Sequence, residues 1–122
     1  MTSKTPLEIV DAYLDAVAER NFEQARIYLH GRNFRYRSPV SNSDDADEFI
    51  AHISKVGPIL ERIDRRRTFA EGIEVCHILR FVTIFSKITS TDTVQWSTVE
   101  DGKITSMEVF FDGRAYREMF IH

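Results

Sequence analysis

The chain has 122 residues, of which 43% are hydrophobic and 29% charged, and its formal net charge is −3. This length fits a single domain, residues 1–122, and the composition is that of a globular protein rather than a disordered one. Scattered charges of both signs argue against nucleic acid or membrane partners. A lone cysteine, Cys76, excludes an internal disulfide. Without a signal peptide or a long apolar stretch, the expected location is cytoplasmic.

The first thirty residues predict two helices joined by a tight corner. Thr5 and Glu8 form a capping box around Pro6, which stands at the first helical position. The apolar stripe of this first helix contains Ile9, Val10, Tyr13, Leu14 and Val17. Asn21 is the expected N-cap of a second, short helix, which carries Phe22, Ala25 and Leu29 and ends before Gly31.

The pattern then changes from helical to extended. Residues 33–38 alternate with a period of two, which predicts a strand that Pro39 ends. The polar residues 41–45 predict a loop, followed by a third helix that Asp44 or Asp45 caps and that Gly57-Pro58 closes. Four strands are predicted after it, at about residues 62–70, 73–86, 92–100 and 103–112, and Asp101-Gly102 joins the last two as a short hairpin.

This order of elements predicts an α+β domain, with the N-terminal helices packed in the concave face of a curved, mostly antiparallel sheet. It is not a βαβ pattern, so a parallel sheet is not expected. The outer face of the sheet would still be apolar, through Ile78, Val82, Ile84, Val94 and Phe110. Because a monomer would expose this patch, we expect a homodimer in which two sheets pack face to face.

Several strings, in this order and spacing, resemble the nuclear transport factor 2-like superfamily, which includes SnoaL-like polyketide cyclases and ketosteroid isomerases. They are Ile9-Val10-Asp11-Ala12-Tyr13-Leu14-Asp15-Ala16 with Asn21-Phe22, Phe34-Arg35-Tyr36-Arg37-Ser38-Pro39, Gly102-Lys103-Ile104-Thr105-Ser106-Met107, and Val109-Phe110-Phe111-Asp112. The resemblance implies a cone-shaped domain, frequent dimers, and a pocket between the sheet and the helices. It does not imply one chemistry, because members of the superfamily range from enzymes to non-catalytic binders.

The resemblance also places three polar residues at positions that are functional in ketosteroid isomerases. Tyr13 matches their oxyanion-binding tyrosine. Ser38, directly before Pro39, stands where their aspartate base is found, and Gln95 falls near their second, acidic oxyanion donor. At two of the three positions the carboxyl group of the isomerases is therefore missing. A serine hydroxyl without a neighbouring base does not take a carbon-bound proton near neutral pH, so isomerase chemistry by that mechanism is not expected.

The expected ligand site is a set of pocket-lining residues that hold a small apolar or aromatic molecule. They are Tyr13, Tyr36, Ser38, Phe49, Gln95, Met107 and Phe111. If the protein is an enzyme, His52 or His77 would carry a proton and Tyr13 would donate a hydrogen bond. Each of these three also has a structural interpretation, as a packed core or boundary residue.

The sequence is compatible with two functions of different class. The first is a small-molecule pocket protein, which would include a SnoaL-like isomerase, cyclase or hydrolase without the aspartate base. The second is a non-catalytic dimerisation or interaction module whose hollow is filled by its own aromatic side chains. No metal-ligand spacing, phosphate loop or nucleophile motif is present, so no cofactor is expected. Asp112 before Gly113 fits ordinary turn chemistry better than the alternative role of a base or a ligand-orienting group.

Overall fold

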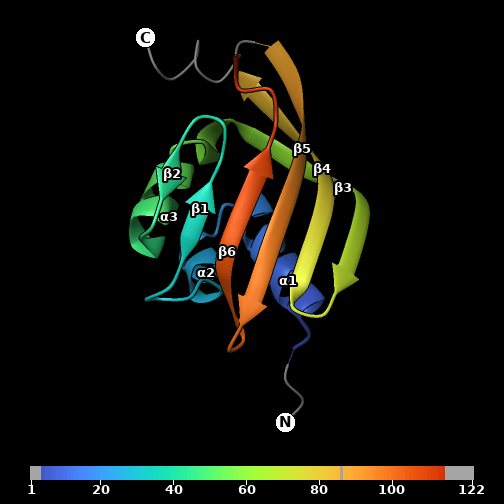
Figure 1. The fold of residues 1–122 in the computed structure, drawn as a ribbon. Helices are drawn as coiled ribbons and strands as arrows, with labels where there is room; N and C mark the ends of the chain where they lie inside the picture. Colours follow the sequence, from blue (N-terminus) through green and yellow to red (C-terminus); the bar gives the residue numbers. More distant parts are fainter. Residues whose placement is uncertain (1–3, 86, 115–122) are drawn as a thin grey trace.

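A computed structural model of the chain describes residues 4–85 and 87–114. In this part of the chain six strands form one curved sheet in the order β2-β1-β6-β5-β4-β3. Figure 1 shows α1 and α2 behind the sheet and α3 beside its β1–β2 end. The elements are α1 (Pro6–Ala18), α2 (Phe22–Ile27), β1 (Arg35–Arg37), β2 (Asn42–Ser43), α3 (Ala46–Ser54), a 3-10 turn (Gly57–Ile59), β3 (Leu60–Glu71), β4 (Glu74–Phe85), β5 (Lys87–Glu100) and β6 (Lys103–Phe110).

The predicted α+β architecture is confirmed. Every neighbouring pair of strands is antiparallel except β1 and β6, which run parallel. The β5–β6 hairpin turns at Asp101 and Gly102, whose φ angles are 55° and 72°. Two successive positive φ angles match the right-handed twist of the strands, so the hairpin forms as its sequence predicts. None of the helices in the described part of the chain has the length and apolar character needed to cross a membrane.

Local capping sets the start of each helix. Thr5 and Glu8 form the predicted capping box of α1, and the Asn21 side chain accepts from the backbone N–H of Gln24 at the start of α2. Asp45 accepts from the N–H of Glu48 and caps α3. Each cap satisfies N–H groups that have no partner within the helix, which is why these boundaries follow from short stretches of sequence.

An arginine anchors the corner between α1 and α2. Arg20 has a φ of 61°, a left-handed conformation that turns the chain sharply between the helices. Its guanidinium donates to the carbonyl oxygens of Gly57, at 2.9 Å, and of Leu60. These bonds link the corner between α1 and α2 to the 3-10 turn and to the first residue of β3. They therefore hold this corner against the segment that follows α3.

Several predicted boundaries differ from the structure. Residues 41–45 are not only a loop, because Asn42–Ser43 forms the short strand β2 against β1. The fifth strand begins at Lys87 rather than at residue 92, since it follows β4 along its whole length. The helix α2 ends at Ile27, and Leu29 instead bridges to Ile104 of β6. Ser86, the predicted last residue of β4, lies outside the described residues.

The two faces of β4 differ in burial. Val75, His77 and Leu79 are fully buried and face the helices, whereas Ile78 lies half-buried on the outer face. On the outer face Ile78 is opposite Val94 of β5, and Val94 is opposite Phe110 of β6. Phe110 is 49% exposed, which leaves an apolar band across three strands. Of the five residues predicted for this face, Ile84 is also exposed, but Val82 is buried.

Candidate functional site

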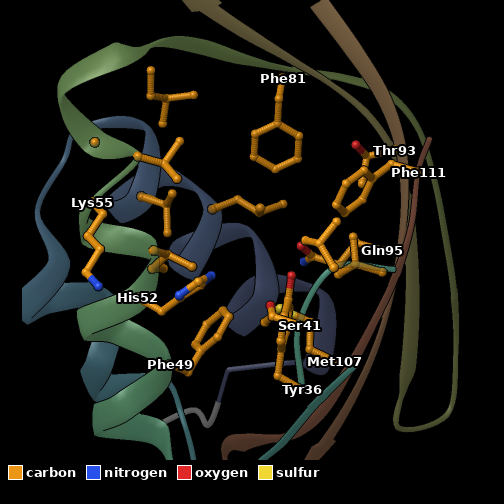
Figure 2. A pocket seen from close by; sticks show the side chains of 18 of the residues that line it. Tyr36, Ser41, Phe49, His52, Lys55, Phe81, Thr93, Gln95, Met107 and Phe111 are labelled. Atoms are coloured by element: carbon orange, nitrogen blue, oxygen red, sulfur yellow. The ribbon is translucent and has the colours of Figure 1, made fainter. Parts of the chain in front are cut away.

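A cavity of about 330 Å³ lies between the sheet and the helices. Its wall comes from nearly every element, so only the complete fold encloses it. Figure 2 shows its lining, with the side chains of α3 on one side and those of the sheet on the other. The lining residues are Tyr13, Leu14, Val17, Phe22, Tyr36, Val40, Ser41, Phe49, His52, Ile53, Lys55, Val56, Gly57, Leu60, Phe81, Thr91, Thr93, Gln95, Met107, Val109 and Phe111.

Aromatic side chains form one end of this cavity. The rings of Tyr36 and Phe49 have centroids 4.4 Å apart, and the ring centroid of Phe34 lies 5.2 Å from that of Phe49. Tyr13 of α1 is 4% exposed, and its burial, together with the nearby Tyr36 phenol, raises the pKa of its hydroxyl. Its phenol therefore stays protonated and can donate a hydrogen bond at neutral pH.

Gln95 supplies the main polar group on the sheet side. It is 3% exposed, and its side-chain Nε2 is buried with no hydrogen-bond partner among the described residues. Figure 2 shows the side chain entering the cavity from β5, near Thr93 and Phe111. A buried amide donor without a partner costs free energy, so its presence at a cavity wall favours a ligand that accepts from it.

Two polar residues of α3 and its C-terminal end line the opposite wall. His52 and Lys55 are both exposed to solvent as well as to the cavity, so they lie at its rim. Lys55 is the C-cap of α3, three residues after His52. The cavity is thus apolar in its interior, with single polar groups at the sheet wall and a basic rim at the helix wall.

His77 faces the helices but is not among the residues that line the cavity. It is fully buried, and its Nε2 lies 2.9 Å from Asp11 Oδ1 on α1. Burial lowers the pKa of His77, and the bond to Asp11 opposes this shift only in part. Arg65 of β3 lies 3.8 Å from the same Asp11 oxygen and bonds Asp15 as well. The imidazole belongs to a polar cluster between α1 and the sheet.

Ser38 is also separate from the cavity. Its hydroxyl accepts from the backbone N–H groups of Val40 and Ser41 and donates to the Ser41 carbonyl oxygen. The Ser38 hydroxyl is therefore fully engaged in hydrogen bonds within the turn at Pro39. Ser41, and not Ser38, lines the cavity. Asp112 accepts from the backbone N–H of Arg114, and ion pairing with that arginine lowers the pKa of its carboxyl to about 2. The side chains of Ser38 and Asp112 therefore both stabilise turns by hydrogen bonds to nearby backbone N–H groups.

The structure thus brings seven of the nine predicted site residues to the cavity. These are Tyr13, Tyr36, Phe49, His52, Gln95, Met107 and Phe111. Sequence reasoning missed Ser41, Lys55, Phe81 and Thr93. The alternation of β5 around Gln95 is a signal that could have found Thr93, since residues two apart share a face. In the described ranges no three His, Cys, Asp or Glu side chains gather as metal ligands would.

Comparison with known proteins places this chain by its fold. No family model matches the sequence, and no curated protein matches it. Among solved structures, a nuclear transport factor 2-like protein of unknown function from Cytophaga hutchinsonii has a TM-score of 0.82 and 23% identity, over 94% of this chain and 96% of that one. An epoxide hydrolase resembling LEH, from M. tuberculosis, has a TM-score of 0.77 and 19% identity, over 88% and 82% of the chains.

A protein described as a SnoaL-like polyketide cyclase, from Jannaschia, matches with a TM-score of 0.77 and 16% identity, over 91% of this chain and 88% of that one. The resemblance expected from the sequence is therefore confirmed at the level of the fold: the chain has the nuclear transport factor 2-like fold. These neighbours differ in described activity, so the function has to be argued from this chain's own residues.

Proposed function

We propose that the protein binds a small apolar or aromatic molecule in the cavity between its helices and its sheet. The observation that carries the proposal is the cavity of about 330 Å³ with Gln95 at its wall. Ligand sites of small molecules begin at about this volume, and they combine an apolar lining with a few polar groups that orient the ligand. The Gln95 amide and the Tyr13 hydroxyl would donate the hydrogen bonds that orient the ligand.

The volume of the cavity supports this function over an interaction module with a filled hollow. Such a module would use its aromatic residues to fill the space, as protein interiors are close-packed. Here Phe49 and Tyr36 pack against each other at one end, and Phe81 and Phe111 lie along the wall. The aromatic residues therefore line the space and do not fill it.

Binding is favoured over catalysis by the chemistry of the lining. An enzymatic use of the cavity would rely on His52 as the proton carrier and Tyr13 as the hydrogen-bond donor. His77 is bonded to Asp11 away from the cavity, and Ser38 is held in its turn. Loss of turnover of a candidate substrate in a His52→Gln variant, with binding retained, would add catalysis to this function.

The proposal is tested with N-phenyl-1-naphthylamine, a neutral dye whose fluorescence rises in apolar surroundings. We expect a saturable increase with one site per chain. Val109 lines the cavity from β6, so Val109→Phe should weaken binding about tenfold, which corresponds to ~1.4 kcal/mol. Val94→Phe, the same substitution on the outer face of β5, is the matched control and should leave binding unchanged. No saturable signal, or equal effects of both variants, would refute the proposal.

We also propose that two copies associate through the outer sheet face. The apolar band of Ile78, Val94 and Phe110 crosses three strands, and Trp96 beside it is 43% exposed. A second copy related by a two-fold axis would cover the band with the same band. Arg80 and Asp92 form an ion pair next to it, 2.9 Å apart, so charges of both signs are available to a two-fold contact.

A further inference from the structure

A second cavity, with a more polar lining, adjoins the apolar one at the rim. Its volume is about 290 Å³. The two cavities share five residues: Tyr36, Ser41, Phe49, His52 and Lys55. The remaining residues of the second cavity are Asn42, Ser43, Glu48 and Ala51. The apolar cavity therefore borders, at His52 and Lys55, on a compartment with hydrogen-bonding and charged walls.

The charges of this outer compartment are ordered along α3. Glu48, His52 and Lys55 lie four and then three residues apart, so they form one stripe on the helix. Glu48 and Lys55 are about 10 Å apart along the axis, from the rise of 1.5 Å per residue. Lys55 and His52 line both cavities, whereas Glu48 lines only the outer one. A ligand group at the point where the two cavities adjoin, called the junction below, therefore lies beside His52 and Lys55 and not beside Glu48.

The Lys55 ammonium has no ion-pair partner in the part of the chain that the structure describes, unlike several of the arginines, such as Arg26 and Arg65. Figure 2 shows Lys55 and His52 on the helix side of the cavity, across from Gln95 and Thr93. The Ser41 hydroxyl, shared by both cavities, adds a neutral donor near the junction. A carboxylate at this point would accept a hydrogen bond from Lys55, and an apolar group attached to it would extend toward Gln95.

We propose that the ligand is an amphipathic carboxylate, with an apolar or aromatic body in the inner cavity and its carboxylate beside Lys55 at the junction. This inference rests on the proposed function and narrows it to a ligand class. It differs from that function in a measurable way, because the inner cavity alone would accept neutral molecules equally well.

The test compares 4-phenylbutanoate with 4-phenylbutan-1-ol as competitors of N-phenyl-1-naphthylamine. Lys55→Gln should weaken the acid about two- to fivefold relative to the alcohol, the range of an exposed ion pair. Lys55→Glu should weaken the acid further. The control Lys4→Gln makes the same charge change at an exposed site outside both cavities, and should alter neither competitor.

The outcomes separate the two proposals. If the dye does not bind at all, the proposed function fails. If the dye binds but neither competitor displaces it, or Lys55→Gln affects acid and alcohol equally, the carboxylate inference is overturned and the proposed function stands. Sodium chloride should weaken the acid selectively, since an exposed charge pair is screened by salt.

Discussion

The Nε2 atom of His77, on a fully buried side chain, lies 2.9 Å from Oδ1 of Asp11. The bond links the middle of the sheet to α1, and Arg65 approaches the same carboxylate from β3. An imidazole in this position is kept neutral by burial, which lowers its pKa below the ordinary value of 6.5.

This burial predicts a pH dependence of stability. Because the folded-state pKa of His77 is lowered, the unfolded chain takes up the proton first as the pH falls. The free energy of unfolding should therefore be constant above about pH 7 and decrease as the pH falls below 6.5. The carboxyls with lowered pKa values, such as Asp92, act only near or below their ordinary value of 3.8.

Urea denaturation at pH 7.5 and pH 5.5 measures this effect. His77→Gln should remove most of the difference between the two pH values. His52→Gln should keep it, because His77 is intact in that variant. A wild-type difference that persists in His77→Gln would mean that another group is responsible.

The unpartnered amide of Gln95 predicts a conflict between stability and binding. Gln95→Leu removes a buried donor that has no partner, so it should stabilise the free protein by about 1 kcal/mol. The same variant should bind an oxygen-bearing ligand more weakly. Gln24, the other glutamine, is exposed, and Gln24→Leu should change stability by less than ~0.5 kcal/mol. Chemical denaturation of both variants measures this, and a destabilised Gln95→Leu would contradict the account.

The contact between Gly57 and Phe22 predicts a tightly packed end of the cavity. A Cβ at position 57 would lie 2.8 Å from the Phe22 ring, closer than side chains tolerate. Gly57→Ala should therefore destabilise the fold by about 1–3 kcal/mol. In a Phe22→Leu background the cost should be smaller, so a double-mutant cycle should show coupling. Gly31→Ala, where the nearest atom is 3.9 Å away, is the control.

The outer sheet face predicts a dimer. Sedimentation equilibrium should give about twice the chain mass of 14.2 kDa. Phe110→Glu should shift the population to monomer, since it places a charge in the apolar band. Ile27→Glu changes an equally exposed apolar residue on α2 and should not. A monomeric wild-type chain at high concentration would exclude this interface.

The helices and hairpin could be predicted because their signals are local. The capping residues Thr5 and Asp45 and the turn Asp101-Gly102 act within a few residues, and each stands in the structure as predicted. The start of β5 could not be predicted from its largely polar first residues, 87–91, because pairing with β4 decides where the strand begins.

The candidate site was predictable where a periodic pattern or the family resemblance placed a side chain. Met107 follows from strand alternation, Tyr13 from the helical stripe and Gln95 from the resemblance, and all three line the cavity. Ser38 was expected there too, but the turn after Pro39 rotates its hydroxyl toward backbone N–H groups. Lys55 was missed because it follows the last turn of an exposed helix, and its position depends on the tertiary fold.

The most direct test of the account is a methyl NMR titration of methionine-labelled protein with N-phenyl-1-naphthylamine. Met107 is 2% exposed and lines the cavity, whereas Met1 and Met119 lie outside the described residues. We predict that the Met107 methyl resonance shifts with the same saturation curve as the dye fluorescence. Saturable dye binding with an unchanged Met107 resonance would place the ligand elsewhere and contradict the central claim.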